Sequence, residues 1–286
     1  MVKKQIAGVL FLLSITPCFA TLATEDPDAA VVRIEHFVQK KKASAATIKE
    51  LTDALRDPVA NIRVKERAAW ALGELDAKSA APALQEAAKH KGLLVRSAAL
   101  NALSRLRVAS ALPTFVSIAE SDPILSLRQN ATLALGLLQT EKAINPLVKL
   151  SEDPAPEIQG ASALAMAATH SKKNDFSEIL KEMTASPNEY VQERARAGLD
   201  AAQRKNTAVL QQLASGDADI RLFAALYFRQ HGTSKELQKL NDFWNGEADE
   251  ETRRQLEMSI KAIKKRVAQA KQKTKPATVP AKKPVK

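Results

Sequence analysis

The stretch "RQNATLALGLL" (residues 128–138) is apolar enough for a core helix, yet every large apolar residue in it is a leucine. Small residues stand where an ordinary core helix would carry bulky ones. The pattern recurs along the chain as a long polar residue followed by alanines and a leucine. That polar residue stands at positions 65, 96, 128, 159, 192, 221 and 253, in steps of 29 to 33 residues. Such regular spacing identifies an internal repeat.

Each repeat contains an earlier apolar segment, and proline often stands near its start, as at Pro82, Pro113 and Pro146. Proline fits the first turn of a helix, where its missing N–H is not needed. Between the two segments lie Asp57-Pro58, Asp122-Pro123, Asp153-Pro154 and Ser186-Pro187, which we interpret as helix start signals. Every repeat is therefore predicted to be a helix, a short turn and a second helix.

The composition supports an all-α fold. Aromatic residues make up only 4% of the 286 residues, whereas apolar residues make up 45%, and there are only 9 glycines. A core built of Ala, Leu, Val and Ile suits close packing of helices better than it suits a sheet. No stretch shows the sustained alternation of a β-strand. We predict an α-solenoid of about seven helix pairs.

The repeat resembles a known family. Asp57-Pro58, followed by Val64-Lys65-x-x-Ala68-Ala69-x-Ala71-Leu72-Gly73, is similar to the HEAT repeat, in particular to the HEAT-like variety named after phycobilisome lyases. The resemblance covers about residues 47–263. It implies a solenoid of HEAT-like helix pairs, but no single function, because such arrays serve many tasks.

The first 20 residues are typical of an export signal. Lys3 and Lys4 precede an apolar run, and the segment ends in a small residue, Ala20. The alternative is a buried helix of the domain. The run is too short to span a bilayer, and Pro17 before Cys18 does not fit a lipoprotein signal. We therefore expect an exported protein, periplasmic or secreted, that is not an integral membrane protein and whose mature form contains no cysteine.

The remaining chain divides into three predicted segments. Residues 21–46 form a linker and an N-terminal capping helix, 47–267 the repeat array, and 268–286 a disordered basic tail of Lys, Pro and Ala. Ten of the 43 Lys and Arg residues lie in 261–286 and two in the signal, which leaves 31 against 32 Asp and Glu in 21–260. The net charge of +11 therefore belongs to the tail, and the body is neutral.

A possible partner site follows from the helical periodicity of the second helices. Counted from the long polar residue, positions +1, +2, +5 and +9 lie opposite the core positions, and in a right-handed stack they should line the concave face. We call these positions the inner-face rows. In the middle repeats they are apolar, and Trp70 adds a large anchor in the first repeat. The candidate partner-binding residues are Trp70, Leu133, Leu137, Leu164, Ala168, Ala197 and Ala201.

Two interpretations of this apolar strip remain open. An exposed apolar strip with a polar rim is typical of a binding groove. Alternatively, neighbouring second helices bury these residues against one another. Changing Leu133 and Leu164 to Glu distinguishes the two interpretations. In an open groove each change should lower the free energy of unfolding by no more than about 0.5 kcal/mol, as is typical of surface substitutions, whereas buried positions should lose much more. The row of Lys65, Arg96, Arg128, Arg221 and Arg253 is interpreted as a structural ladder of ion pairs that reach back to the turns, rather than as a phosphate site.

The sequence offers no recognisable catalytic centre, cofactor site or metal site. The chain has four histidines, and His90, His170 and His231 each fall near the end of a predicted helix, where the helix dipole favours them. The iron site of deoxyhypusine hydroxylase, a HEAT-like enzyme, uses His-Glu pairs, and this chain has no His-Glu dipeptide. Phycobilisome lyases bind a bilin inside the cell, which an export signal argues against.

We therefore predict a non-enzymatic scaffold or adaptor that binds a protein or peptide partner along the concave face. The first alternative is a module that binds polyanions or an anionic envelope polymer, without specificity for nucleic acid, through the tail. Its candidate residues are Lys271, Lys273, Lys275, Lys282, Lys283 and Lys286. The second alternative is an enzyme with an unrecognised site.

Overall fold

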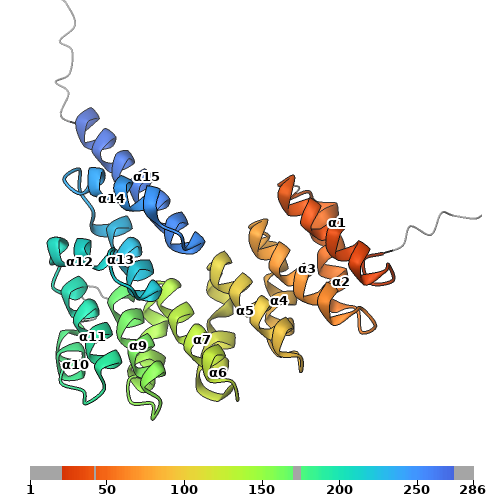
Figure 1. Cartoon of the computed structure of the whole chain (residues 1–286), viewed down its shortest axis with the longest axis horizontal. Helices are drawn as coiled ribbons and strands as arrows, with labels where there is room; N and C mark the ends of the chain where they lie inside the picture. The colour runs from red at the N-terminus through yellow and green to blue at the C-terminus, as the bar shows by residue number, and fades with distance from the viewer. Residues whose placement is uncertain (1–20, 42, 170–174, 274–286) are drawn as a thin grey trace, which may run out of the picture. The chain divides into compact units, whose positions relative to one another are not determined.

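The computed structural model describes residues 21–41, 43–169 and 175–273, and the regular secondary structure in these ranges is entirely helical (Figure 1). A single helix, α1 (Pro27–Gln39), precedes seven helix pairs. The pairs are α2 (Ala45–Arg56) with α3 (Ile62–Glu74), α4 (Ala81–Ala87) with α5 (Leu93–Leu106), α6 (Leu112–Ser121) with α7 (Leu125–Leu137), α8 (Ile144–Leu150) with α9 (Pro156–Thr169), α10 (Ser177–Met183) with α11 (Glu189–Ala202), α12 (Asn206–Gln212) with α13 (Ala218–His231), and α14 (Leu237–Gly246) with α15 (Glu250–Lys273). The predicted all-α solenoid of about seven helix pairs is confirmed.

The chain divides into two compact units, one up to Ala102 and one from Leu103 onward. In the first unit, α3 packs against both α1 and α2. In the second unit, the second helices α7, α9 and α11 lie side by side, and α13 packs against α15. Helix α13 also contacts α9, so it lies across its neighbours rather than beside α11 alone.

The turns between paired helices differ in detail from the predicted start signals. The second helices begin three or more residues after the Asp or Ser of the Asp-Pro and Ser-Pro pairs. The Asp57 carboxylate accepts a hydrogen bond from the N–H of Val59 at 2.8 Å, and Asp122 accepts one from Ile124 at 2.9 Å. These side chains therefore shape the turn between the two helices and do not cap the second helix. The proline lies two or more residues before the start of that helix, which leaves room for a local Asx turn.

The glycine of the quoted stretch marks a close approach of two helices. A Cβ on Gly136 would stand 2.5 Å from the Cα of Ala165 in α9 and 3.0 Å from Cε1 of Phe223 in α13. In the first unit, a Cβ on Gly73 would likewise meet the Cα of Ala102 at 2.9 Å. The small residues of the repeat therefore let backbones approach one another, which explains why this stretch lacks bulk.

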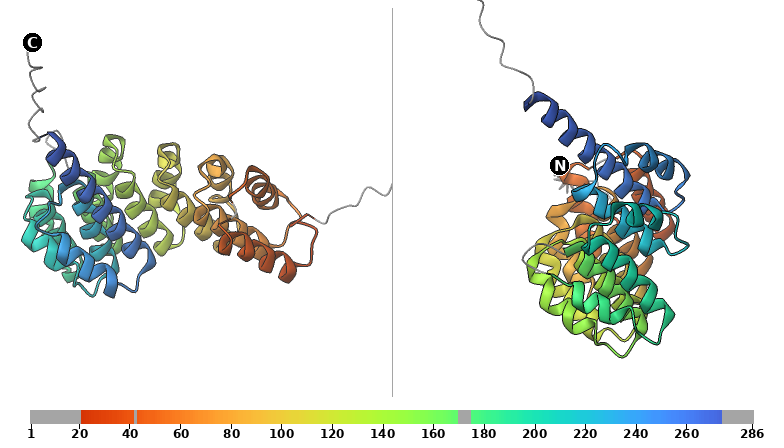
Figure 2. Two further views of the ribbon diagram at one scale, coloured as in Figure 1. Left: turned by 90° about the horizontal axis from the view of Figure 1, so that it is seen from above. Right: turned by 90° about the vertical axis from the view of Figure 1, so that its left-hand side faces the viewer.

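The C-terminal helix is longer than the sequence analysis predicted. The basic tail was expected to begin at residue 268, but α15 runs past Val267 to Lys273. Residues 268–273 are Ala, Gln and Lys, all strong helix formers, and the first proline beyond them is Pro276. The last turns of α15 project from the second unit in Figure 2, with residues 264–266 and 268–270 exposed.

Candidate functional site

The predicted apolar strip is a continuous surface, but it is part of the core of the second unit. Leu133, Leu137, Leu164 and Ala197 are buried, with Leu164 only 2% exposed. They pack with residues from α13, namely Ile220, Phe223 and Leu226. Ala168 packs at the edge of this cluster and Ala201 at the edge of the adjacent one. The hypothesis of an open groove along these residues is therefore wrong.

The physical reason is the position of α13. Burying a leucine side chain is worth about 1.5–3 kcal/mol, so an array able to cover this strip with its own helix gains stability by doing so. A small cavity lies beside the strip, lined in part by Leu164, Ala201 and Tyr227. Its volume of about 20 Å³ holds roughly one water molecule and no side chain of a partner.

Trp70 is a predicted partner-binding residue that lies outside the buried cluster of the second unit. It lies on α3 in the first unit and is half-buried. The guanidinium of Arg67, one turn earlier, stands 5.3 Å from the centre of the indole ring, and it also lies 3.6 Å from a carboxylate oxygen of Glu35 in α1. A large aromatic side chain on the inner-face rows of the first repeat thus lies beside a cation that is itself paired with an anion.

The row of long polar residues has a structural role, but through hydrogen bonds to backbone carbonyls of the turns rather than through the predicted ion pairs with the Asp of each turn. Arg96 donates to the carbonyl oxygens of His90 and Lys91, both at 3.1 Å, and so ties the start of its own helix to the preceding turn. Gln159 and Gln192 make the same contact at 2.7 and 2.6 Å, to carbonyl oxygens six residues earlier. The two glutamines that interrupt the charge pattern therefore preserve the hydrogen bond.

Two arginines of the ladder also link successive repeats. Arg128 pairs with Asp153, and Arg221 donates from Nε and Nη2 to the two carboxylate oxygens of Glu247, at 2.9 and 3.2 Å. Both acidic residues lie at the helix–helix turn of the following repeat. The sequence analysis expected the arginines to reach back to their own turns, and it did not anticipate this forward pairing, because the register between repeats is set by tertiary packing.

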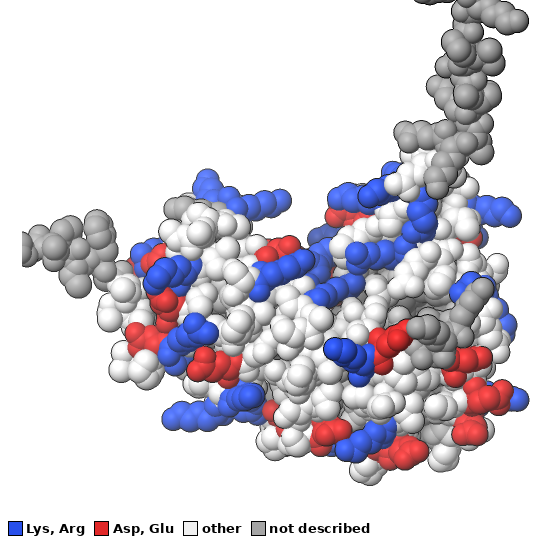
Figure 3. Space-filling view, turned by 180° about the vertical axis from the view of Figure 1, so that it is seen from behind, with Lys and Arg blue, Asp and Glu red and all other residues white. Residues whose placement is uncertain are grey.

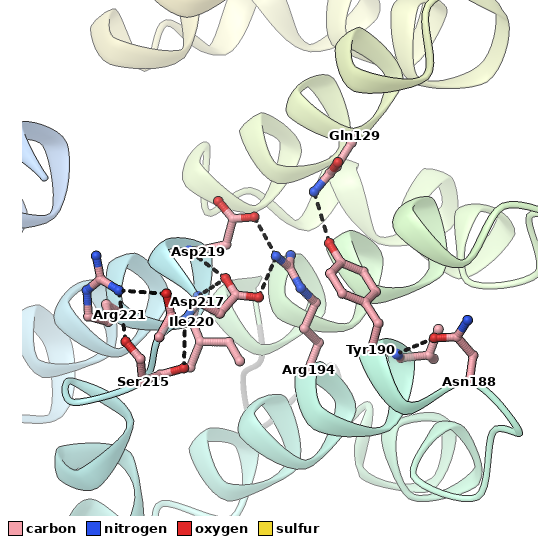
Figure 4. A network of polar contacts seen from close by, with 11 residues as sticks. Gln129, Asn188, Tyr190, Arg194, Ser215, Asp217, Asp219, Ile220 and Arg221 are labelled. Carbon is pink, nitrogen blue, oxygen red and sulfur yellow. Dashed lines mark hydrogen bonds and ion pairs between the residues drawn. The ribbon is translucent and has the colours of Figure 1, made fainter.

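A buried polar network holds α13 against its neighbours (Figure 4). Arg194 of α11 is 3% exposed, and its Nη2 lies 2.7 Å from carboxylate oxygens of both Asp217 and Asp219 at the start of α13. The guanidinium also stands 4.3 Å from the centre of the Tyr190 ring, and the Tyr190 hydroxyl accepts a hydrogen bond from Gln129 of α7 at 3.0 Å.

The network ties together three helices that contribute to the apolar strip. Burial raises the pKa of Tyr190 to about 12, so its hydroxyl is neutral over the physiological range. Arg194 falls on an inner-face row, two positions after Gln192, and its pairing was not among the predictions from the sequence. The sequence did contain a signal for this pairing, because Asp217 and Asp219 stand two positions apart at the start of α13.

The described histidines make local contacts. His90 accepts a hydrogen bond from the N–H of Gly92 at 2.9 Å, and the ring of His231 lies 4.8 Å from that of Tyr227. Within the described ranges, no group of three or more His, Cys, Asp and Glu residues is placed to hold a metal ion. None of the helices in those ranges is both long and apolar enough to cross a membrane.

The tail residues are only partly within the described chain. Lys271 and Lys273 belong to α15. His170 and the remaining tail candidates Lys275, Lys282, Lys283 and Lys286 lie outside the described residues. The geometry therefore neither supports nor opposes a role for the tail lysines.

The fold defined by these helix pairs is that of a repeat α-solenoid. A family model of HEAT repeats matches residues 48–125 and 112–200, which together exceed half of the chain. The protein belongs to the HEAT repeat family. A search of curated protein sequences found no match.

Solved structures with similar folds include proteins of different functions. The CpcE–CpcF complex of phycocyanin lyase from Nostoc sp. PCC7120 superposes with a TM-score of 0.56 at 18% identity, over 76% of this chain and 94% of that one. A designed armadillo repeat protein in complex with the peptide (KR)4 gives a TM-score of 0.50 at 21% identity, over 64% and 96% of the two chains. Likenesses at this level of identity show the fold alone.

Proposed function

We propose that this chain is an exported, non-enzymatic scaffold that binds a protein or peptide partner through the inner-face rows of its second helices. A repeat solenoid suggests a protein–protein interaction scaffold, because stacked repeats present an extended surface to a partner. The proposed binding face rests on the position and surroundings of Trp70. This residue combines accessibility with flanking charges, whereas the other apolar candidates are covered by α13.

Tryptophan and arginine are the residue types most often found at the energetic centre of protein interfaces. The pairing of Arg67 with the Trp70 ring keeps both side chains on the same face of α3. A partner that covered the indole would bury apolar area and retain the nearby charges of Arg67 and Glu35 at the rim. This arrangement is typical of an interface centre with a polar border.

We expect Trp70→Ala to abolish specific partner capture by the purified chain. Truncating a central interface tryptophan commonly costs about 2 kcal/mol or more, which weakens binding roughly thirtyfold. The measurement is cross-linking with envelope fractions, followed by quantification of the captured proteins. Trp244→Ala is the matched control, because Trp244 is 37% exposed but lies on α14, a first helix.

A captured protein supports the proposal only if Trp70→Ala loses it and Trp244→Ala retains it. Equal capture by both variants would contradict the proposed binding face. Capture that persists in Trp70→Ala but disappears when residues 274–286 are removed would instead favour the basic tail. The exposed Lys264 and Lys265 on the projecting end of α15 extend the positive charge of that segment and support this second candidate.

Export is the second part of the proposal, and it predicts a defined N-terminus. Leu22 is only 1% exposed, so the second residue after Ala20 is already buried in the fold. Glu25 also lies 3.0 Å from Arg33 of α1. A cleavage after Ala20 would leave these contacts intact. We expect intact-mass spectrometry of protein recovered from an exporting bacterial host to give a chain that begins at Thr21. A chain that retains residues 1–20 would contradict the export signal.

A further inference from the structure

A cluster of arginines lies where the start of α15 meets the end of α5 within the second unit. Arg254 donates from Nη2 to the carbonyl oxygen of Arg105 at 3.4 Å, although the two residues are 149 positions apart. Glu251 lies 3.0 Å from Nε of Arg254 and 3.8 Å from Nη1 of Arg105. The Glu251 carboxylate is thus shared between two guanidinium groups that are far apart in the sequence.

Arg107 brings a third guanidinium to this place. It follows α5 in the left-handed backbone conformation, with φ at 48°. Its Nε and Nη2 atoms are shielded from solvent and have no hydrogen-bond partner within the described ranges. Burial is the main cause that lowers the pKa of Arg107 to about 10, with Arg229 and Arg254 acting in the same direction and Glu251 opposing them. The side chain still carries its charge at neutral pH.

Arg229 of α13 is the fourth member, and no ion pair involves its side chain among the residues that the structure places. Arg105, Arg107 and Arg254 thus lie around Glu251, and Arg229 acts on Arg107 from α13. Glu250 stands 3.9 Å from Arg105 at the margin. Further buried polar atoms without a hydrogen-bond partner lie on the first turns of α15, namely Thr252 Oγ1 and Gln255 Oε1. Buried donors and acceptors are nearly always paired in folded proteins, so the unpaired Nε and Nη2 donors of Arg107 point to a bound group.

We propose that this cluster, formed by Arg105, Arg107 and Arg254 around Glu251 with Arg229 near Arg107, binds the carboxylates of an acidic segment of a protein partner. We take the ligand to be a protein segment because the proposed function is protein binding, so this part of the inference rests on the proposed function. The cluster has an excess of positive charge that a carboxylate would neutralise, and the unpaired donors of Arg107 match the two oxygens of a carboxylate.

The surroundings favour an extended acidic segment over a single small anion. Arg105 occupies an inner-face row of the second repeat, the kind of position expected to meet a partner. Arg266 donates to the carbonyl oxygen of Arg229 at 2.6 Å and so carries the positive surface further along α15. On the face drawn in Figure 3, Lys and Arg side chains outnumber Asp and Glu side chains at the upper right. The same chain also pairs buried or half-buried arginines with carboxylates at Arg194 and Arg221.

The test uses a fluorescently labelled hexaglutamate peptide and fluorescence anisotropy. The full-length protein carries Gln in place of Lys275, Lys282, Lys283 and Lys286, so that tail lysines do not bind the probe. We expect hexaglutamate to bind, and Arg107→Gln and Arg229→Gln each to weaken binding about tenfold or more, the loss typical of a hydrogen bond to a charged group. Arg253→Gln is the matched control, because this exposed arginine adjoins Arg254 in sequence and forms no ion pair with the acidic residues of the cluster among the described residues, and it should change the Kd by less than about twofold.

Equal binding by all three variants, or no binding of hexaglutamate, would overturn the inference. Inorganic phosphate that competes at the same concentration as hexaglutamate would also overturn it, because the site would then accept any anion. If Arg107→Gln does not fold, Arg229→Gln decides the outcome. If this inference fails, the partner capture that depends on Trp70 is still expected. Conversely, hexaglutamate binding that depends on Arg107 would persist if the Trp70 face proved wrong.

Discussion

Replacing Leu164 by Glu should destabilise the second unit by more than about 3 kcal/mol. Leu164 is 2% exposed and packs in the cluster with Leu133, Phe223 and Leu226. The substitution removes a buried apolar side chain and places a carboxylate in an apolar environment, where each effect alone costs several kcal/mol. Urea denaturation followed by circular dichroism measures the loss as a lower midpoint for the unfolding of this unit.

The matched control is Leu94→Glu. Leu94 is 54% exposed in the first turn of α5, so a glutamate there remains solvated and lies favourably near the positive end of the helix dipole. We expect a change within about 0.5 kcal/mol. If Leu164→Glu were as mild as Leu94→Glu, the strip would be an open groove after all.

The second large effect is expected for Gly136→Ala. The added methyl group would meet the backbone of Ala165 at 2.5 Å, and backbone atoms cannot move aside as a flexible side chain can. Helices α7 and α9 would have to separate, and Phe223 would have to shift as well. Overpacking of this kind costs about 1–3 kcal/mol or more, which exceeds the gain of about 1 kcal/mol from the better helix propensity of alanine. Thermal unfolding should show a lower Tm.

Gly246→Ala tests the same chemical change without the close approach. Nothing stands within 4 Å of a Cβ at Gly246, the last residue of α14. Alanine there should be neutral or slightly stabilising, because it reduces the freedom of the unfolded chain. A Tm that falls equally in both variants would mean that the loss of glycine itself, and not the contact with Ala165, is responsible.

The helices could be predicted from the sequence because the signals are local. Small apolar residues at helical spacing, the repeat of about 31 residues and the Asp-Pro turns between segments act within one repeat. The end of α15 shows the limit of such signals. The lysines of the C-terminal segment suggested disorder from residue 268, yet the Ala and Gln residues among them extend the helix to Lys273.

The candidate site could be predicted only in part. The inner-face rows placed the Leu133 and Leu164 positions on one continuous surface, and the role of half-buried Trp70 in binding stays a prediction. The same rows could not show whether that surface was covered. Ala and Leu at these positions fit an open groove and a helix interface equally well, so the pattern within a repeat carries no information on the choice.

The sequence by itself determined the repeat, the helix pairs, the all-α class and the neutral body with a basic C-terminus. The tertiary structure alone decided that α13 covers the apolar strip and that Arg107, Arg229 and Arg254 meet. Helix formation depends on contacts three or four residues apart, which a short stretch specifies. The packing of α13 on α9 and the approach of Arg254 to Arg105 depend on the small rotation between successive repeats, which accumulates over the array and appears in no single repeat.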